Sequence, residues 1–134
     1  MSTRPALILI CDDEAHITHV VSSRLRRAGF DVMIAGDGEE AFELAREHTP
    51  DLVITDLQMP YTSGLELSLR LRCNTATAST PVIMLTARGY VLDSDDVRAT
   101  NIRLVMSKPF SAREIVQRVS EILEIADDLN KEAA

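Results

Sequence analysis

The stretch DLVITDLQMP, residues 51–60, joins a continuous apolar run to an acidic residue and then to a proline. A continuous apolar run is typical of a strand that is buried on both faces of a parallel sheet. In open parallel sheets, ligands bind beyond the carboxyl ends of the strands. The stretch therefore predicts a buried strand over residues 51–55 that presents Asp56 at the ligand-binding edge of a sheet.

Other apolar runs in the chain also end in polar side chains. They are ALILI (6–10) before Asp12 and Asp13, PVIML (81–85) before Thr86, and RLVM (103–106) before Lys108 and Pro109. With DVMIA (31–35) they make five strands, and helical segments between them require parallel pairing with right-handed crossovers. The pattern predicts an α/β fold in three layers, doubly wound from five strand–helix units. For the polar ends to meet, the first and third strands must be neighbours.

The helix after the first strand is the most regular one. Residues 14–28 place apolar side chains at helical spacing, and Gly29 follows in the usual position for a C-terminal glycine. The segment GLELSLRLR (64–72) alternates apolar and polar residues as a strand would. Its Leu, Glu and Arg residues are strong helix formers and none of them is β-branched, so we interpret it as a helix.

The remaining helices are marked at their starts. Asp37 with Glu40 and Ser111 with Glu114 have the spacing of capping boxes. The stretch from residue 89 to 102 is less regular and accommodates only a short acidic helix. The last helix is expected to end near Leu129, with residues 129–134 as a frayed tail.

Composition narrows the class of protein. At 134 residues the chain suits one domain, and its net charge of −7 comes without a basic stripe, so no direct DNA binding is expected. No apolar run approaches the ~20 residues that span a bilayer, and the N-terminus lacks a signal-peptide pattern, which favours a cytoplasmic protein with no membrane attachment. Cys11 and Cys73 lack the spacing of a zinc site.

The polar strand ends carry a consistent chemistry. Asp12, Asp13 and Asp56 offer oxygen ligands without His or Cys, the set that suits a hard cation such as Mg²⁺. Asp12 could equally hold coordinated waters. A carboxylate beside Mg²⁺ can attack phosphorus and form an aspartyl phosphate. Lys108 and Thr86 could contact its oxygens, although singly they could be a surface charge and a helix cap.

These residues together resemble the receiver domain of two-component response regulators, the CheY-like family. The resemblance covers roughly residues 6–128, and it implies a stand-alone receiver domain over residues 1–134. The family has a flavodoxin-like sandwich with strand order 2-1-3-4-5. The motifs, in chain order, are Asp12-Asp13-Glu14, Thr55-Asp56-Leu57-Gln58-Met59-Pro60 with Gly64 beyond it, Thr86-Ala87, and Lys108-Pro109-Phe110.

The resemblance assigns a role to each acidic residue. It implies that Asp56 is the phosphoacceptor, which takes a phosphoryl group from a phosphohistidine on a sensor histidine kinase or a histidine phosphotransfer protein. It implies that Asp13, Asp56 and the backbone carbonyl of Gln58 coordinate Mg²⁺ and that Asp12 holds a coordinated water. The chain would then be no enzyme, except that it catalyses its own phosphoryl transfer and autodephosphorylation.

The resemblance also implies how the phosphate is sensed. Lys108 and Thr86, with Ala87 beside it, contact the phosphoryl group, and the face formed by residues 86–110 repacks. That face docks on a downstream protein partner, and it could also pair two copies of the chain. The Lys108–Pro109 bond is implied to be cis.

Two features depart from the family's pattern or tune it. Many receivers carry an aromatic residue three positions before the lysine, where this chain has Val105, so we expect signalling through backbone shifts of residues 86–110. Gln58 and Arg88 occupy positions that in the family influence how fast the aspartyl phosphate hydrolyses. Arg88 could equally be a solvated loop residue.

Two alternatives remain at this point. A Mg²⁺-dependent phosphohydrolase of the haloacid-dehalogenase type also forms an aspartyl phosphate, but it needs an acid where this chain has Gln58, and it needs cap insertions. A docking module that works without phosphorylation would not require an intact set of site residues.

Overall fold

The computed structural model describes residues 4–87 and 91–133, with side chains as far as Glu124. Five parallel strands form one sheet in the order β2-β1-β3-β4-β5, which confirms the predicted doubly wound, flavodoxin-like fold. The strands are β1 (Leu7–Cys11), β2 (Asp31–Ala35), β3 (Leu52–Asp56), β4 (Val82–Thr86) and β5 (Ile102–Ser107). The helices are α1 (Ala15–Arg27), α2 (Gly38–His48), α3 (Gly64–Arg72), α4 (Ser94–Arg98) and α5 (Ala112–Ala133).

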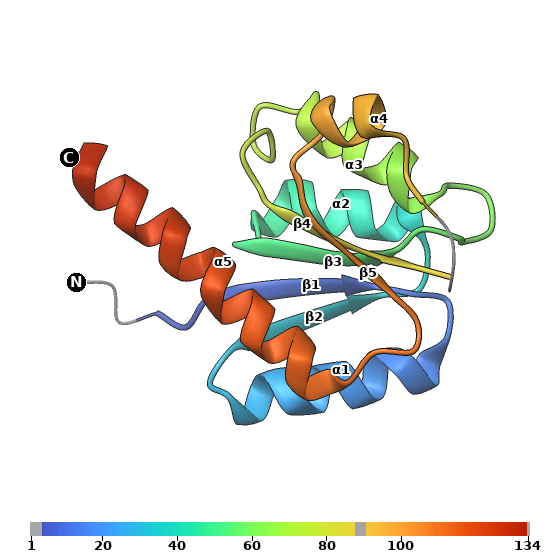
Figure 1. The fold of residues 1–134 in the computed structure, drawn as a ribbon, viewed down its shortest axis with the longest axis horizontal. Coiled ribbons are helices and arrows are strands. Elements are labelled where there is room, and N and C mark those ends of the chain that lie inside the picture. The colour runs from blue at the N-terminus through green and yellow to red at the C-terminus, as the bar shows by residue number, and fades with distance from the viewer. Residues whose placement is uncertain (1–3, 88–90, 134) are drawn as a thin grey trace.

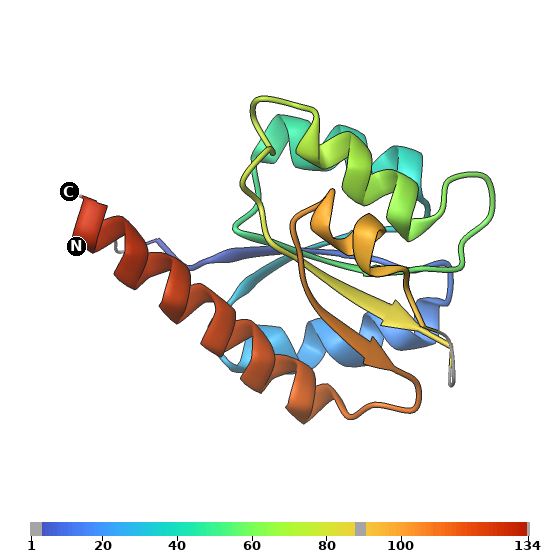
Figure 2. The same cartoon turned by 45° about the horizontal axis from the view of Figure 1, so that its top comes forward.

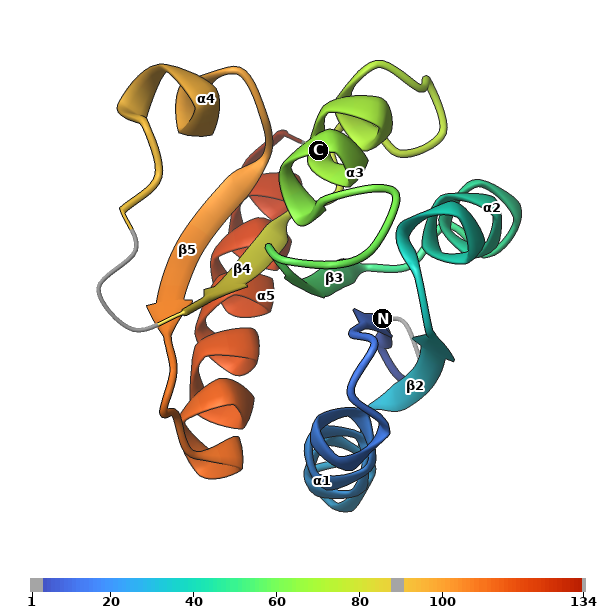
Figure 3. The ribbon, with the colours of Figure 1, turned by 90° about the vertical axis from the view of Figure 1, so that its right-hand side faces the viewer.

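Helices cover both faces of the sheet (Figure 1). Seen from the side, α1 and α5 lie on one face, and α2, α3 and α4 lie on the other (Figure 3). Side chains alternate along each strand, so Leu9 and Cys11 enter one buried cluster while Ile8 and Ile10 enter the other. The continuous apolar runs in the sequence are explained by this double burial.

Four strands, β1, β3, β4 and β5, end one residue later than predicted, and two of these ends carry site residues. β3 ends at Asp56 and β4 ends at Thr86, because Asp56 pairs with Leu85 and Thr86 pairs with Ser107. The backbone N–H of Leu57 continues the ladder by donating to the carbonyl of Leu85 at 2.8 Å. Asp56 and Thr86 are therefore held by sheet hydrogen bonds rather than by loops.

The structure confirms the predicted third helix but not the predicted end of the last one. GLELSLRLR forms α3, and the hydroxyl of Ser63 accepts from the N–H of Glu66 at 3.1 Å to cap it. The prediction that the last helix ends near Leu129 was wrong, since α5 continues to Ala133. The extra residues include Lys, Glu and Ala, which are strong helix formers. Figure 2 shows the C-terminal half of α5 projecting beyond the sheet.

Both predicted capping boxes place their first residue as a helix cap. The Asp37 carboxylate accepts from the N–H of Glu40 at 2.8 Å, and the Ser111 hydroxyl accepts from the N–H of Glu114 at 3.0 Å.

Within the described part of the chain, no helix is long and apolar enough to span a bilayer.

Candidate functional site

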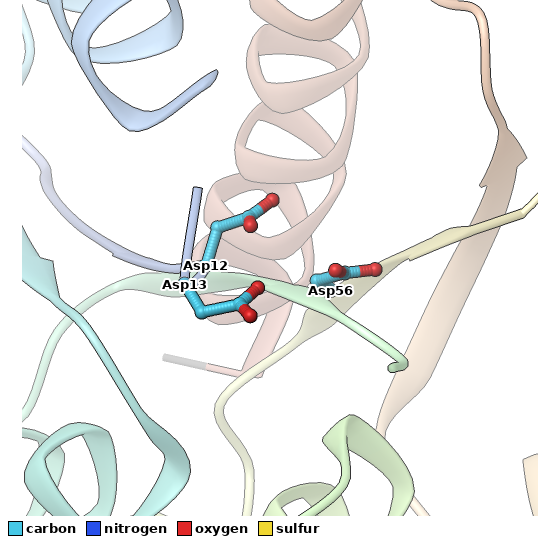
Figure 4. A group of neighbouring side chains, drawn as sticks. All are labelled: Asp12, Asp13 and Asp56. Atoms are coloured by element: carbon cyan, nitrogen blue, oxygen red, sulfur yellow. The ribbon is translucent and has the colours of Figure 1, made fainter. Parts of the chain in front are cut away.

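The three predicted carboxylates meet at the carboxyl edge of the sheet. Asp12 and Asp13 follow β1, and Asp56 ends the neighbouring strand β3, which pairs with β1 up to Cys11 and Thr55. One oxygen from each carboxylate lies within 4.8 Å of the others. Figure 4 shows the three side chains grouped at this edge. The arrangement follows directly from the 2-1-3 strand order, which places the first and third strands side by side.

Asp12 is a buried carboxylate with incomplete hydrogen bonding. Only 2% of the residue is exposed, and its Oδ1 accepts from the N–H of Glu14 at 2.9 Å. Its Oδ2 has no hydrogen-bond partner among the described residues. The pKa of Asp12 is raised to about 6, mainly by burial; the Glu14 N–H opposes this rise, and the negative charge of Asp56 contributes to it. A nearby cation would therefore stabilise the charged form of the Asp12 carboxylate.

Asp56 is similarly buried, with 4% of the residue exposed. Burial raises its pKa, and the Lys108 charge and the Gln58 backbone partly oppose that rise. Asp13 is exposed and lies at the mouth of the cluster. Two buried acids beside an exposed one form a site that a cation would stabilise.

Lys108 places a positive charge of the chain beside these carboxylates. Its Nζ lies 3.5 Å from Asp56 Oδ2 and 3.6 Å from Glu14 Oε1. Its backbone N–H donates to the Thr86 carbonyl at 2.8 Å, which fixes the chain just after β5. The Lys108–Pro109 peptide bond is cis.

Thr86 faces a neighbouring strand. It is fully buried, and its Oγ1 donates to the backbone carbonyl of Met106 at 3.4 Å. Ala87 after it is partly buried. The sequence predicts that the Thr86 hydroxyl contacts a phosphoryl oxygen. In this structure it instead joins the ends of β4 and β5.

Other predicted residues lie at the rim or on the surface. Gln58 is exposed, and Val105 on β5 is 37% exposed. Arg88, a predicted modulator, lies outside the described residues.

Two residues matter more than the sequence reasoning indicated. Glu14 was noted only as part of a motif, yet it forms an ion pair with Lys108. Gly64 packs so tightly on the backbone of β3 that a Cβ there would overlap the carbonyl oxygen of Asp56. A glutamate at the start of a helix, where it caps poorly, was the available signal for Glu14.

An apolar groove of about 240 Å³ adjoins Lys108. It runs between the first half of α1 and the segment that precedes α5. Its walls are His16, Ile17, Val20, Val21, Lys108, Pro109, Phe110 and Ala112.

Fold and site together define a class: flavodoxin-like α/β domains with an acidic site at the switch point between β1 and β3. The family model of the response regulator receiver domain matches residues 8–120. The chain belongs to this family, whose members are phosphorylation-controlled signalling switches of two-component systems.

Individual relatives agree with this assignment. The chain is 37% identical over 126 residues to the DNA-binding dual master transcriptional regulator RpaA of Synechocystis, covering 94% of this chain and 52% of that protein. It is 38% identical over 124 residues to the alkaline phosphatase synthesis transcriptional regulatory protein PhoP of Bacillus subtilis, covering 87% and 48%. The chain therefore spans about half the length of these curated relatives.

Solved structures support the fold. The chemotaxis protein CheY4 of Vibrio cholerae superposes with a TM-score of 0.81 at 28% identity, covering 88% of this chain and 98% of that one. A response regulator protein of Burkholderia multivorans gives a TM-score of 0.72 at 35% identity, covering 89% and 95%.

Proposed function

We propose that Asp56 is the phosphoacceptor of this receiver domain. The observation that carries the proposal is a buried carboxylate, 4% exposed, at the carboxyl end of the central strand, with Lys108 Nζ 3.5 Å away and two further carboxylates beside it. One carboxylate would be a nucleophile, and the surrounding charges would position and neutralise a phosphoryl group.

The residues present fit Mg²⁺. Every candidate ligand is an oxygen, as Mg²⁺ prefers, and Asp12 Oδ2 is buried without a hydrogen-bond partner among the described residues. Asp13, Asp56 and the Gln58 carbonyl would hold the ion, and Asp12 would bind it directly or through a water. When bound, the ion supplies positive charge that screens the phosphoryl oxygens.

The transfer step uses the chain's own groups. An Asp56 carboxylate oxygen attacks phosphorus, the P–N bond of the donor phosphohistidine breaks, and the imidazole leaves with the electron pair. Lys108 contacts a phosphoryl oxygen throughout. The chain would also catalyse the later attack of water on the aspartyl phosphate, which returns Asp56 to its free form. Gln58 and Arg88 would influence the rate of this hydrolysis.

Thr86 is proposed to transmit the change. Its hydroxyl donates to the Met106 carbonyl at 3.4 Å, a long bond that a strong phosphoryl acceptor can replace. That exchange would leave the β5 carbonyl without its Thr86 partner and shift the face formed by residues 86–110. A downstream protein, or a second copy of the chain, would then bind this face without direct contact to DNA.

The phosphodonor would be a sensor histidine kinase or a histidine phosphotransfer protein in the cytoplasm. The apolar groove beside Lys108 supports a protein donor, because it offers a docking surface next to the acceptor.

One assay tests the proposal against its alternatives. Incubation with acetyl phosphate and Mg²⁺ should add one phosphoryl group, stable in acid and labile in base. Asp56→Asn or excess EDTA should abolish it, and the exposed control Asp96→Asn on α4 should not. Rapid release of many equivalents of phosphate would instead indicate a phosphohydrolase, and no incorporation would indicate a docking module.

A further inference from the structure

We propose that Glu14 is a positioning residue that competes with Asp56 for Lys108; this rests on the proposed function of Asp56. The Lys108 ammonium lies 3.5 Å from Asp56 Oδ2 and 3.6 Å from Glu14 Oε1. One cation is therefore shared between two carboxylates at nearly equal distances. Attraction toward Glu14 reduces the share of Lys108 that is available to the acceptor.

The start of α1 explains how Glu14 reaches Lys108. Glu14 is the N-cap residue of α1, a position that favours Ser, Thr, Asp or Asn, because their short side chains accept hydrogen bonds from the first turn. Within the described part of the chain, the Glu14 side chain makes no such bond. Its backbone N–H is instead anchored to Asp12 Oδ1 at 2.9 Å. The backbone is fixed to the acidic cluster, and the side chain is left to pair with Lys108.

Exposure makes this pair exchangeable. The Glu14 side chain is 59% exposed and the Asp56 side chain only 6% exposed. An ion pair to an exposed carboxylate is weak, whereas a phosphoryl group on Asp56 carries roughly −1.5 to −2 charges in a mostly buried site where the carboxylate carried only one. Lys108 would then leave Glu14 for the phosphoryl group. Glu14 holds the lysine at the mouth of the site and releases it when phosphate arrives.

The kinetic consequence concerns binding of the donor. With acetyl phosphate, an Asp56 oxygen forms the new bond to phosphorus, the P–O bond to the acetyl group breaks, and acetate leaves with the electron pair. Lys108 contacts the phosphoryl group before and during this step. Glu14→Gln should therefore lower the half-saturating donor concentration about two- to fivefold, the range of one exposed ion pair, with little change in the maximal rate.

A double-mutant cycle tests whether Glu14 acts through Lys108. Glu14→Gln is measured alone and in a Lys108→Met background, with acetyl phosphate, Mg²⁺ and intact mass as the readout. The control is Glu47→Gln on α2, also exposed and without an ion pair among the described side chains. We expect Glu14→Gln to lower the half-saturating donor concentration when Lys108 is present and to leave it unchanged in the Lys108→Met background. An equal gain in both backgrounds, or none in the first, overturns the proposal.

A second measurement is independent of phosphorylation. In the metal-free protein, Glu14→Gln should change the Lys108 Cε and Hε chemical shifts, and Glu47→Gln should leave them unchanged. Unchanged shifts in both variants overturn the pairing. This comparison decides the matter where the Lys108→Met background is too slow to follow. If the wild-type chain takes no phosphate, the proposed function fails while the shifts still report on the Glu14–Lys108 pair.

Discussion

Replacing Asp12 by Asn should stabilise the metal-free protein at neutral pH. The carboxylate is 2% exposed, its Oδ2 has no hydrogen-bond partner among the described residues, and two other carboxylates lie beside it. Asparagine keeps the oxygen that accepts from the Glu14 N–H and removes the charge. Its amide can donate to the neighbouring carboxylates, which are acceptors.

The pKa of Asp12 sets the magnitude. Burial raises it from 3.8 to about 6, so the folded state binds the proton more tightly than the unfolded state does. The stability associated with this group is present below pH 3.8 and is lost as the pH rises through 6. At about 1.4 kcal/mol per pH unit, the full cost at pH 7.5 is on the order of 3 kcal/mol. Imperfect bonding of the new amide offsets part of it, which leaves about 1–2 kcal/mol.

Urea unfolding in EDTA at pH 7.5 and at pH 4 measures this difference. Asp12→Asn should gain about 1–2 kcal/mol at pH 7.5, or about 4–8 °C in Tm, and most of the gain should vanish at pH 4. Asp13→Asn is the matched control, because its side chain is exposed. A variant no more stable than wild type at pH 7.5, or a gain equal at both pH values, would refute the reasoning.

Three further outcomes follow from the packing of the site. Gly64→Ala should lower the free energy of unfolding by about 2 kcal/mol or more, because a Cβ would overlap the Asp56 carbonyl and lie 2.8 Å from Met84 Sδ; a loss below about 0.5 kcal/mol, as at a surface site, would contradict the close approach. Thr86→Val should still accept phosphate, but phosphorylation should no longer change the NMR chemical shift of the Ser107 amide, which follows the Met106 carbonyl. A shift change that persists would show another route into β5. A maleimide should label one thiol in the native protein, because Cys73 is exposed and Cys11 is buried, and a second only in urea; rapid labelling of two native thiols would argue against the packed core.

Much of the fold could be predicted because burial on both faces leaves a clear trace in the sequence. Runs such as DLVIT show no alternation of polar and apolar residues, which is typical of strands in a parallel sheet covered on both faces. The strand ends were harder to predict. Asp56 and Thr86 belong to β3 and β4 because their backbones pair with the next strand, and no side-chain pattern records that pairing.

The site was predictable in its membership but not in its internal contacts. Parallel strands bring their carboxyl ends together whatever the rotamers, so Asp12, Asp13 and Asp56 had to meet. Which oxygen faces Lys108, and whether Glu14 shares it, depends on side-chain torsions that spacing along the chain does not determine. The end of α5 was missed because a polar tail of helix formers resembles a frayed end.

We propose that the contacts of Thr86 let the switch operate with a valine at position 105. The Thr86 hydroxyl donates to the Met106 carbonyl, and the Thr86 carbonyl accepts from the Lys108 N–H. The first bond joins β4 to β5 and the second joins β4 to Lys108 just after β5, so the two bonds lie on either side of Ser107. Val105 immediately precedes Met106, the first residue of this bonded segment. Its β-branched side chain has few rotamers to change. We therefore expect a signal from Thr86 to move Val105 together with its backbone, so that the exposed face of β5 shifts as a unit rather than through the swing of a single ring.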